Sequence, residues 1–470
     1  MLWSGITRRA KYGLAAAVCL IFAAGIMCLK THSRTWGVCV MGLPEKVNIE
    51  LADEDVPLYI LKQTHEPLLR KDDGQNYTSK ILSRWRRNVG STTYEFCPSG
   101  KARFDAAHPF TAEYLKKHLD AVTTKYAPEF STELSGECVV VRFANGRIGY
   151  MDFLSMLGNA PTLGKTENIE LGLGEFAVKS IDKSRINLSR KEGCSNCYTD
   201  IIIYEAAANP EDDLKREDVA DFNRISWREF PLDLAERFMS FESIPLKSGG
   251  LVLTTTDKDL RRVIYGCVDI PRFRRVVFPH KKKFNNISTI LPVGVPGGIA
   301  GKPEQHCRPL KKYGRAVLLA AIARGNEAEV MEYAETFRRR TGLEMRVQFY
   351  SAHELVKVLF ARPHPFDMVA ISFSVVQPEY ETFFKDFVTN DGLVDYDLPR
   401  VSELRRSLLK LEDERGRTEL AAKIAKELAG EAAVLPLYQE VRTFYYPAEI
   451  KNMMVGRGFT EYPEVADFKW

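Results

Sequence analysis

The stretch AVLLAAIARGNEAEVMEYAETFRRRTGLEMRVQFY, residues 316–350, decides the fold class of this 470-residue chain. It opens with a continuous apolar run, which is typical of a strand buried on both faces. Gly325 follows the run, and residues 327–341 then place apolar side chains at the spacing of one helix face. Gly342 stands where a helix ends, and apolar residues alternate over 343–349 as in a second strand. The stretch therefore predicts a strand–helix–strand unit.

The same alternation continues on the C-terminal side. A short helix is predicted over 353–360 and another apolar strand over 367–373. Strands that alternate with helices are typical of a largely parallel sheet. Two amphipathic helices and two strands complete this half, over 401–411, 420–432, 434–438 and 443–446.

The first half of the chain is mostly β. Segments rich in β-branched and aromatic residues predict strands over 36–42, 92–97, 138–143, 175–180, 185–190 and 200–206. Thr111 can cap a helix between the second and third of these strands. Residues 291–303 are rich in Pro and Gly and predict an extended loop. The chain thus reads as a β-rich lobe, an α/β lobe and a return to β.

The N-terminus predicts the compartment. Arg8, Arg9 and Lys11 precede an uncharged, apolar stretch over residues 12–29. This is the pattern of a signal peptide, but its length also reaches the lower limit of a membrane-spanning helix. Cleaved signal and inner-membrane anchor both remain open. In either case we expect Thr31 onward to lie outside the cytoplasm, in the periplasm or cell envelope.

Charge argues against nucleic acid as a partner. The net charge is +4, but residues 1–34 carry five basic residues and no acid. The rest of the chain is therefore close to neutral, whereas nucleic-acid binding needs a basic surface.

Motifs for catalysis, cofactors and metals are incomplete. Gly172 and Gly174 lack the third glycine of a dinucleotide fingerprint, and the residues after them alternate as a strand instead of opening a helix. His353 and Glu354 begin a zinc-protease pattern, but Lys357 stands where the second His is needed. We predict no catalytic residue, no cofactor and no metal site.

Cys194 and Cys197 form the one motif with chemical content. The pair lies in a predicted turn between two strands, so a disulfide that pins a hairpin is one interpretation. A redox dithiol and half of a zinc site are the others, although no second cysteine pair has suitable spacing.

Eight segments, in order, resemble one family. They lie at 65–72, 81–85, 93–96 with 101–104, 110–115, 172–176, 260–263 with Asp269, 291–297 and 433–438. Together they are similar to family 5 extracytoplasmic solute-binding proteins, which include the oligopeptide-, dipeptide- and nickel-binding subunits of bacterial ABC importers. The resemblance implies a two-lobed, periplasmic-binding-protein-like α/β fold (class II type, large cluster C) behind the N-terminal apolar helix.

The resemblance also implies domain bounds. We expect a signal peptide or anchor over 1–30, a β-rich N-terminal lobe over 36–250 with a subdomain at 65–155, an α/β lobe over 251–433, and a return of 434–470 to the N-terminal lobe. It implies a monomer that captures a small, peptide-like ligand between its lobes and delivers it to an ABC permease.

The sequence departs from the family at the ligand site. Peptide-binding members carry a Trp and an Asp in the stretch that corresponds to residues 372–378, and the Asp pairs with the ligand's α-ammonium. Here Phe373 replaces the Trp and Val376 lies near the place of the Asp. The resemblance implies Phe373 and Ser374 as ligand contacts, and Glu66 is a further candidate. The missing Asp and the apolar N-terminus keep an alternative function open: an anchored, divergent member that acts as a sensor or envelope scaffold without transport.

Overall fold

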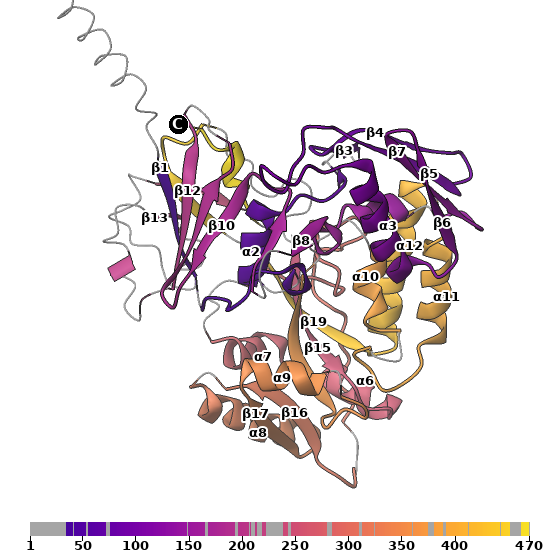
Figure 1. The fold of residues 1–470 in the computed structure, drawn as a ribbon. Helices are drawn as coiled ribbons and strands as arrows, with labels where there is room; N and C mark the ends of the chain where they lie inside the picture. The colour runs from indigo at the N-terminus through magenta and orange to yellow at the C-terminus, as the bar shows by residue number, and fades with distance from the viewer. Residues whose placement is uncertain are drawn as a thin grey trace, which may run out of the picture.

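The structure is a computed structural model that describes most of the chain from Arg34 onward (Figure 1). The described residues are 34–40, 42–52, 55–71, 76–147, 149–164, 168–192, 196–205, 207, 212–213, 219–221, 238–242, 246–279, 284–309, 313–323, 325–359, 361–374, 380–388, 392–411, 413–441, 443–451 and 462–469. The predicted signal or anchor, residues 12–29, lies outside them. Within these ranges no helix is long and apolar enough to cross a membrane.

A five-stranded mixed sheet forms the centre of the α/β lobe. Its strands, in spatial order, are β17 (Met345–Tyr350), β16 (Val317–Ile322), β18 (Met368–Ser374), β15 (Lys247–Leu253) and β19 (Val434–Glu440). The predicted strand–helix–strand unit is confirmed as β16, α8 (Glu327–Thr341) and β17, with Gly342 in the left-handed region at φ 76°. β16 runs parallel to β17 and β18, whereas β15 runs antiparallel to both of its neighbours.

Helices cover both faces of this sheet because its apolar residues point alternately to either side. Leu251 and Leu253 share a core with α6 (Lys258–Cys267), α7 (Ile270–Val277) and α8. Val252, between them, belongs to the core on the opposite face. That face is covered by α9 (Ala352–Leu359), α10 (Tyr380–Lys385), α11 (Pro399–Leu408) and α12 (Glu414–Gly430).

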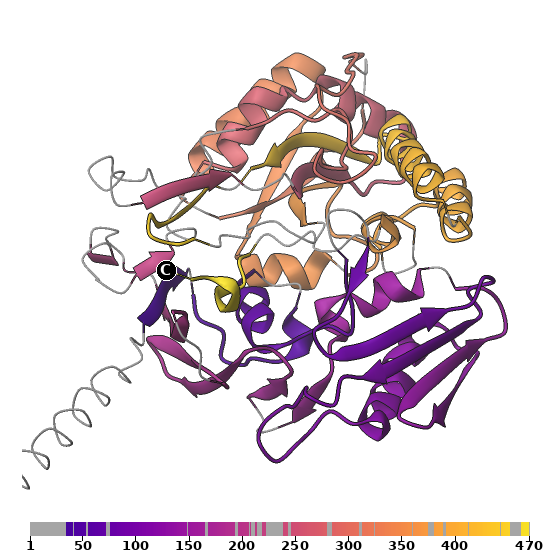
Figure 2. The same ribbon diagram turned by 90° about the horizontal axis from the view of Figure 1, so that it is seen from above.

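A second five-stranded sheet forms the β-rich lobe, in the order β10 (Phe176–Ile181), β11 (Arg185–Arg190), β12 (Tyr198–Glu205), β1 (Arg34–Val40) and β13 (Val219–Asp221). It packs against α2 (Asp55–Thr64) and the C-terminal residues. Trp36 is fully buried there, and its ring lies 5.6 Å from that of Tyr446 and 5.0 Å from that of Phe468. Both described ends of the chain therefore lie in one lobe, and Figure 2 shows the C-terminus beside the indigo strand β1.

A smaller sheet with its own core adjoins the β-rich lobe. Its order is β4 (Leu82–Arg87), β5 (Thr93–Pro98), β7 (Cys138–Phe143) and β6 (Phe130–Ser135). α3 (Ala112–Tyr126) and α4 (Tyr150–Leu154) bury their apolar faces against it. The predicted cap is confirmed, because the Thr111 side chain accepts a hydrogen bond from the Tyr114 backbone N–H. The remaining short elements are β2 (Arg70–Lys71), β3 (Tyr77–Thr78), β8 (Thr162–Gly164), β9 (Glu170–Gly172) and the 3-10 helices Ile49–Leu51, Leu157–Asn159 and Val465–Asp467.

Two strands that lie side by side connect the α/β lobe with the β-rich lobe. β14 (Phe238–Glu242) pairs antiparallel with β20 (Thr443–Pro447). β15, which follows β14 in the chain, likewise pairs antiparallel with β19, which precedes β20. We call these four strands the crossing ribbon. Both passages of the chain between the lobes therefore follow one path.

The predicted lobe bounds need a correction at this ribbon. We expected residues 434–470 to return to the N-terminal lobe, but β19 is an edge strand of the α/β sheet and the return comes at β20. Residue 250, the expected end of the first lobe, lies inside β15. The physical reason is that β15 and β19 bury nearly all of their residues within the α/β lobe.

Gly172 and Gly174 allow close packing. A Cβ on Gly172 would lie 2.4 Å from the Thr64 carbonyl oxygen, and one on Gly174 would lie 2.5 Å from the Thr64 carbonyl carbon. These approaches are too short for any side chain. The pair leads into strand β10, as the sequence predicted, and its glycines serve the packing of β9 and β10 against the end of α2.

Candidate functional site

The predicted ligand contacts lie in separate parts of the molecule. Phe373 is a core residue of the α/β lobe, with its ring 5.8 Å from Phe383 and 5.6 Å from Phe387. Ser374 ends β18 and pairs with Lys247 of the crossing ribbon; its side chain lies outside the described part. Glu66 follows α2 in the other lobe.

Glu66 belongs to an ionic cluster that attaches the C-terminal segment to α2. Glu66 is 3% exposed, and its carboxylate accepts two hydrogen bonds from the Arg70 guanidinium, which also binds Glu464. Burial alone would raise the pKa of Glu464, but Arg70, Lys62 and Lys80 outweigh it and lower the pKa to about 2. The cluster therefore has a clear structural role within the N-terminal lobe.

A second ionic cluster joins the two lobes, and sequence reasoning missed it. Asp152 of α4 is 1% exposed; its carboxylate lies 3.1 Å from Lys71 Nζ and accepts a hydrogen bond from the Tyr77 hydroxyl. Its other oxygen lies 3.5 Å from Nη2 of Arg417, which belongs to α12 of the α/β lobe. We call these four residues the interlobe cluster.

The electrostatics of the interlobe cluster follow from its burial. Lys71 and Arg417 are each 8% exposed, so both cations have lost most of their hydration. Burial, and then the negative charge of Asp152, raise the pKa of Tyr77 far above its ordinary value. Tyr77 therefore stays neutral, and its hydroxyl donates a hydrogen bond to the carboxylate. The ion pairs of Asp152 hold charged groups of the two lobes together, and the interlobe cluster contains no nucleophile paired with a base.

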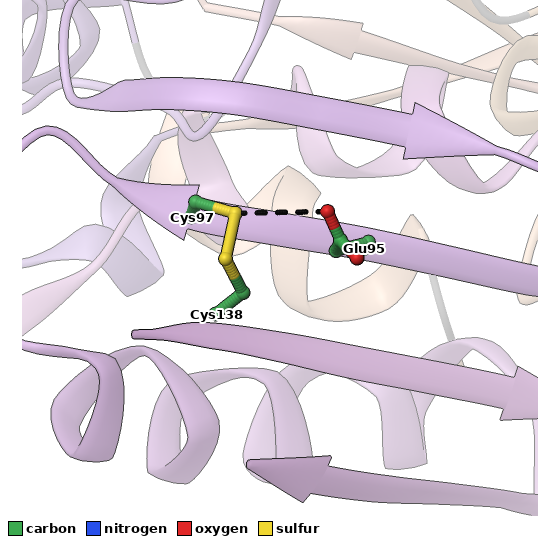
Figure 3. Close-up of side chains that lie close together, drawn as sticks. All are labelled: Glu95, Cys97 and Cys138. Atoms are coloured by element: carbon green, nitrogen blue, oxygen red, sulfur yellow. Dashed lines mark hydrogen bonds between the residues drawn. A yellow bond between two sulfur atoms is a disulfide. The ribbon is translucent and has the colours of Figure 1, made fainter. Parts of the chain in front are cut away.

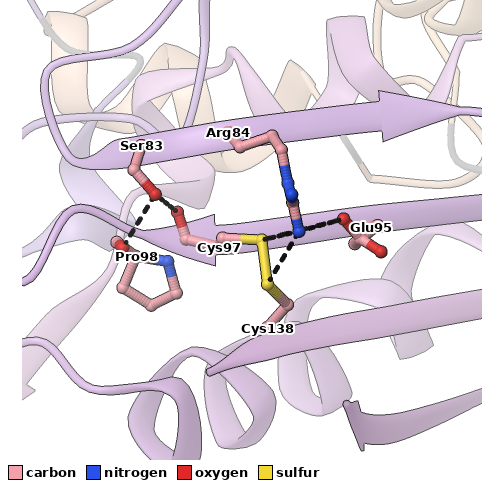
Figure 4. The surroundings of a disulfide bond; sticks show 6 residues. All are labelled: Ser83, Arg84, Glu95, Cys97, Pro98 and Cys138. Atoms are coloured by element: carbon pink, nitrogen blue, oxygen red, sulfur yellow. Dashed lines mark hydrogen bonds and ion pairs between the residues drawn. A yellow bond between two sulfur atoms is a disulfide. The ribbon is translucent and has the colours of Figure 1, made fainter. Parts of the chain in front are cut away.

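Glu95, Cys97 and Cys138 form the one group of three potential metal ligands found among the described residues. Figure 3 shows that the two sulfur atoms are bonded to each other, with Glu95 beside them. Figure 4 adds the Arg84 guanidinium, whose Nη2 lies 3.5 Å from each sulfur and 2.9 Å from Glu95 Oε1. Disulfide sulfurs are not thiolates, and a neighbouring cation disfavours a metal ion. The residues do not suit a metal while the bridge is intact.

The structure describes one of the two cysteines of the predicted Cys194–Cys197 pair. Cys197 is disulfide-bonded, while Cys194 lies outside the described residues, so a Cys194–Cys197 bridge stays a prediction. Two bridges that the sequence did not predict are Cys97–Cys138 and Cys267–Cys307. Cys39 is a buried thiol. The antiparallel register of β5 and β7 ends with Phe96 opposite Val139, and the next residues on the two strands are Cys97 and Cys138. No local sequence pattern states that register.

One buried histidine, His65, and one half-buried histidine, His118, are expected to give the N-terminal lobe a pH dependence. Burial, with a smaller contribution from Lys191, lowers the pKa of His65 to about 3, and burial lowers the pKa of His118 to about 4. The Thr64 hydroxyl donates to the Ile60 carbonyl, so His65 Nδ1–H donates to Thr64 Oγ1. The lowered pKa keeps the His65 ring neutral. Each histidine is neutral when folded, whereas an unfolded histidine binds a proton below about pH 6.5.

We expect stability to fall between pH 7.5 and pH 5. Both folded pKa values lie below the unfolded value, so protonation favours the unfolded chain. The free energy of unfolding is therefore unaffected by these histidines above about pH 6.5 and decreases as the pH falls below it. Each histidine should account for about 2 kcal/mol of the loss at pH 5. Urea unfolding at the two pH values measures it. His118→Gln should reduce the difference and His306→Gln, on the surface, should not; an unchanged difference in His118→Gln would contradict the assignment.

The comparisons with known proteins agree with this architecture. No family model and no curated protein matches the chain by sequence. Among solved structures, NikA from Brucella suis in complex with Fe(III)-EDTA has a TM-score of 0.72 at 16% identity, covering 93% of this chain and 100% of that one. A dipeptide-binding protein from Pseudoalteromonas sp. SM9913 in complex with Met-Leu has a TM-score of 0.75 at 12% identity, with the same coverage.

A third similar structure is NikA from Staphylococcus aureus in complex with Ni(L-His)2, with a TM-score of 0.72, 14% identity, and coverage of 93% of this chain and 100% of that chain. Identities this low speak to the fold alone. The chain has the two-lobed α/β fold of the family 5 extracytoplasmic solute-binding proteins of ABC importers, as the ordered motifs in its sequence predicted.

Proposed function

We propose that this chain is an extracytoplasmic solute-binding protein of a peptide-type ABC importer, which captures a small ligand between its lobes and catalyses no reaction. The observation that carries the proposal is the crossing ribbon. Because β14–β15 and β19–β20 run side by side, the lobes are joined along one line and can rotate about it. A ligand that contacts both lobes would favour the closed arrangement over the open one.

The fold comparisons support a small ligand without naming it. The similar proteins were solved with a dipeptide, a nickel–histidine complex and an iron chelate. In this chain Val376 lies near the place of the family's Asp, and Phe373 is packed against Phe383 and Phe387. Phe373, Ser374 and Glu66 stay predicted ligand contacts. In this proposal the protein partner is an ABC permease, and the chain works on the periplasmic or cell-envelope side of the membrane.

Ligand-induced stabilisation tests the proposal. A ligand at a hundredfold excess over its Kd should stabilise the folded chain by about 2.7 kcal/mol, which raises the melting temperature measurably. We expect a saturable rise with one member of peptide, sugar and nickel-chelate sets, or with the low-mass fraction of an extract. The exposed variant Asp182→Ala should respond as the wild type does. If no set and no extract shifts the melting temperature, the proposal fails.

A further inference from the structure

The outer face of the four-stranded sheet β4–β5–β7–β6 carries the side chains of Glu95, Cys97 and Cys138. Tyr94 and Phe96 of β5 belong to the core under α3, so Glu95 and Cys97, which alternate with them, point to the opposite face. Cys138 of β7 projects from the same face, because it is bonded to Cys97. The two cysteines are 41 residues apart in the chain, so no zinc motif in the sequence reveals them, and strand pairing brings them together.

The three ligand atoms lie close enough together for one ion. The two sulfurs and a Glu95 carboxylate oxygen lie within 4.8 Å of one another, and Figure 3 shows the carboxylate beside the bridge. In a tetrahedral zinc site, bonds of about 2.0–2.3 Å place neighbouring ligand atoms about 3.5–3.8 Å apart. The Cα atoms of the two cysteines are 4.2 Å apart, so their sulfurs can take up this spacing once the bond between them is broken. The three side chains then form a three-sided site with an open fourth position.

Charge decides when this site can hold a cation. While the bridge is closed, the charge of Glu95 is neutralised by the Arg84 guanidinium at 2.9 Å. Two thiolates and a carboxylate carry three negative charges, which a divalent ion and Arg84 together balance. Arg84 Nη2 lies 3.5 Å from each sulfur, within reach of a hydrogen bond to a thiolate (Figure 4). The Arg84 side chain is 49% exposed, so it can turn toward solvent and let an ion reach the sulfurs.

We propose that reduction of the Cys97–Cys138 bridge creates a site for a thiophilic divalent cation such as Zn²⁺, held by both thiolates and by Glu95. A dithiol reductant breaks the bridge: it forms its own disulfide and supplies the two electrons and two protons that convert the cysteines to thiols. Binding of the ion releases both protons to solvent and forms two metal–sulfur bonds and one metal–oxygen bond, with water in the fourth position. Thiolate ligands favour Zn²⁺ over Mg²⁺ and Ca²⁺, which prefer oxygen. The site belongs to a single sheet and does not depend on solute capture.

Co²⁺ is the probe of this site, because its thiolate complexes absorb in the near ultraviolet and its tetrahedral complexes absorb in the visible. The full chain is reduced with a phosphine, since a dithiol would compete for the ion, and the phosphine is removed without oxygen before titration. We expect the reduced wild type to bind one more equivalent of Co²⁺, with sulfur-to-cobalt absorption, than the reduced variant Cys97→Ser/Cys138→Ser. Zn²⁺ should remove this absorption by displacing Co²⁺, and the oxidised wild type should lack it.

Two carboxylate variants test the third ligand. Glu95→Gln should weaken Co²⁺ binding by a factor of about ten or more, while the sulfur-to-cobalt absorption at saturation remains. Glu133→Gln is the matched control: it changes an exposed carboxylate on β6 of the same sheet, which pairs with Arg142, so it should bind Co²⁺ as the wild type does. Circular dichroism before and after reduction verifies that each protein is folded.

Three results would overturn the inference: equal sulfur-to-cobalt absorption in the reduced Cys97→Ser/Cys138→Ser variant, equal affinity in Glu95→Gln, or loss of the folded state on reduction in the presence of Co²⁺. The last result counts because the site exists only while β5 and β7 stay paired. None of the three bears on the proposed function, whose test is ligand-induced stabilisation of the oxidised chain.

Discussion

Replacing Asp152 with alanine should lower the free energy of unfolding by about 3–5 kcal/mol. The substitution removes the carboxylate from between Lys71 and Arg417, which lie at 3.1 Å and 3.5 Å from it. Both cations are 8% exposed, so water cannot replace the lost partner without a rearrangement. Because Arg417 belongs to the other lobe, the loss should also weaken the contact between the lobes.

Urea unfolding of Asp152→Ala and of the double variant Asp152→Ala/Lys71→Met measures this cost. The double variant should recover part of the lost free energy of unfolding, because it removes the unpaired Lys71 cation along with the Asp152 carboxylate. Asp182→Ala is the matched control, because Asp182 pairs with Arg185 on the surface and exposed pairs contribute ~0–1 kcal/mol. Equal, small effects at Asp152 and Asp182 would show that the interlobe cluster is as hydrated as a surface pair.

Removing the Cys267–Cys307 bridge should cost about 4 kcal/mol. The bridge closes a loop with a sequence separation of 40, and the entropy of that loop in the unfolded chain sets the magnitude. The loop contains the Pro- and Gly-rich segment, whose Gly297 lies against the start of α12: a Cβ there would be 2.9 Å from the Thr418 carbonyl oxygen. The bridge therefore also supports the helix that carries Arg417.

Denaturant unfolding of the double variant Cys267→Ser/Cys307→Ser tests this value against the wild type. In the presence of a dithiol reductant the two proteins should unfold alike, because the bridge is then absent from both. A difference that persists under reduction would mean that the serines disturb packing around the fully buried Cys267, and that the loop closure contributes little.

Local patterns predicted the elements well. The helix bounds 327–341 and the Thr111 cap match the structure because both depend on neighbours within a few residues. The order of the α/β sheet was not predictable in this way. β15 pairs with β19 across almost the whole second half of the chain, and no local signal states that an apolar run will be an edge strand.

The interlobe cluster was hidden for a similar reason. Lys71, Asp152 and Arg417 are ordinary charged residues in the sequence, and only the packing of α12 against the other lobe brings them together. Glu66, which motif resemblance selected, instead contacts Arg70 within one lobe. Resemblance identified the fold through many weak matches, but the charges between the lobes depend on tertiary contacts that a single sequence does not contain.

Mass spectrometry of small molecules released when the purified chain is denatured tests the central claim most directly. If the chain captures a solute between its lobes, one low-mass compound should be released in near-equal amount to the protein, and it should raise the melting temperature when added back. If no compound is released above the background of the buffer alone, and no extract stabilises the chain, the claim that it captures a solute is contradicted.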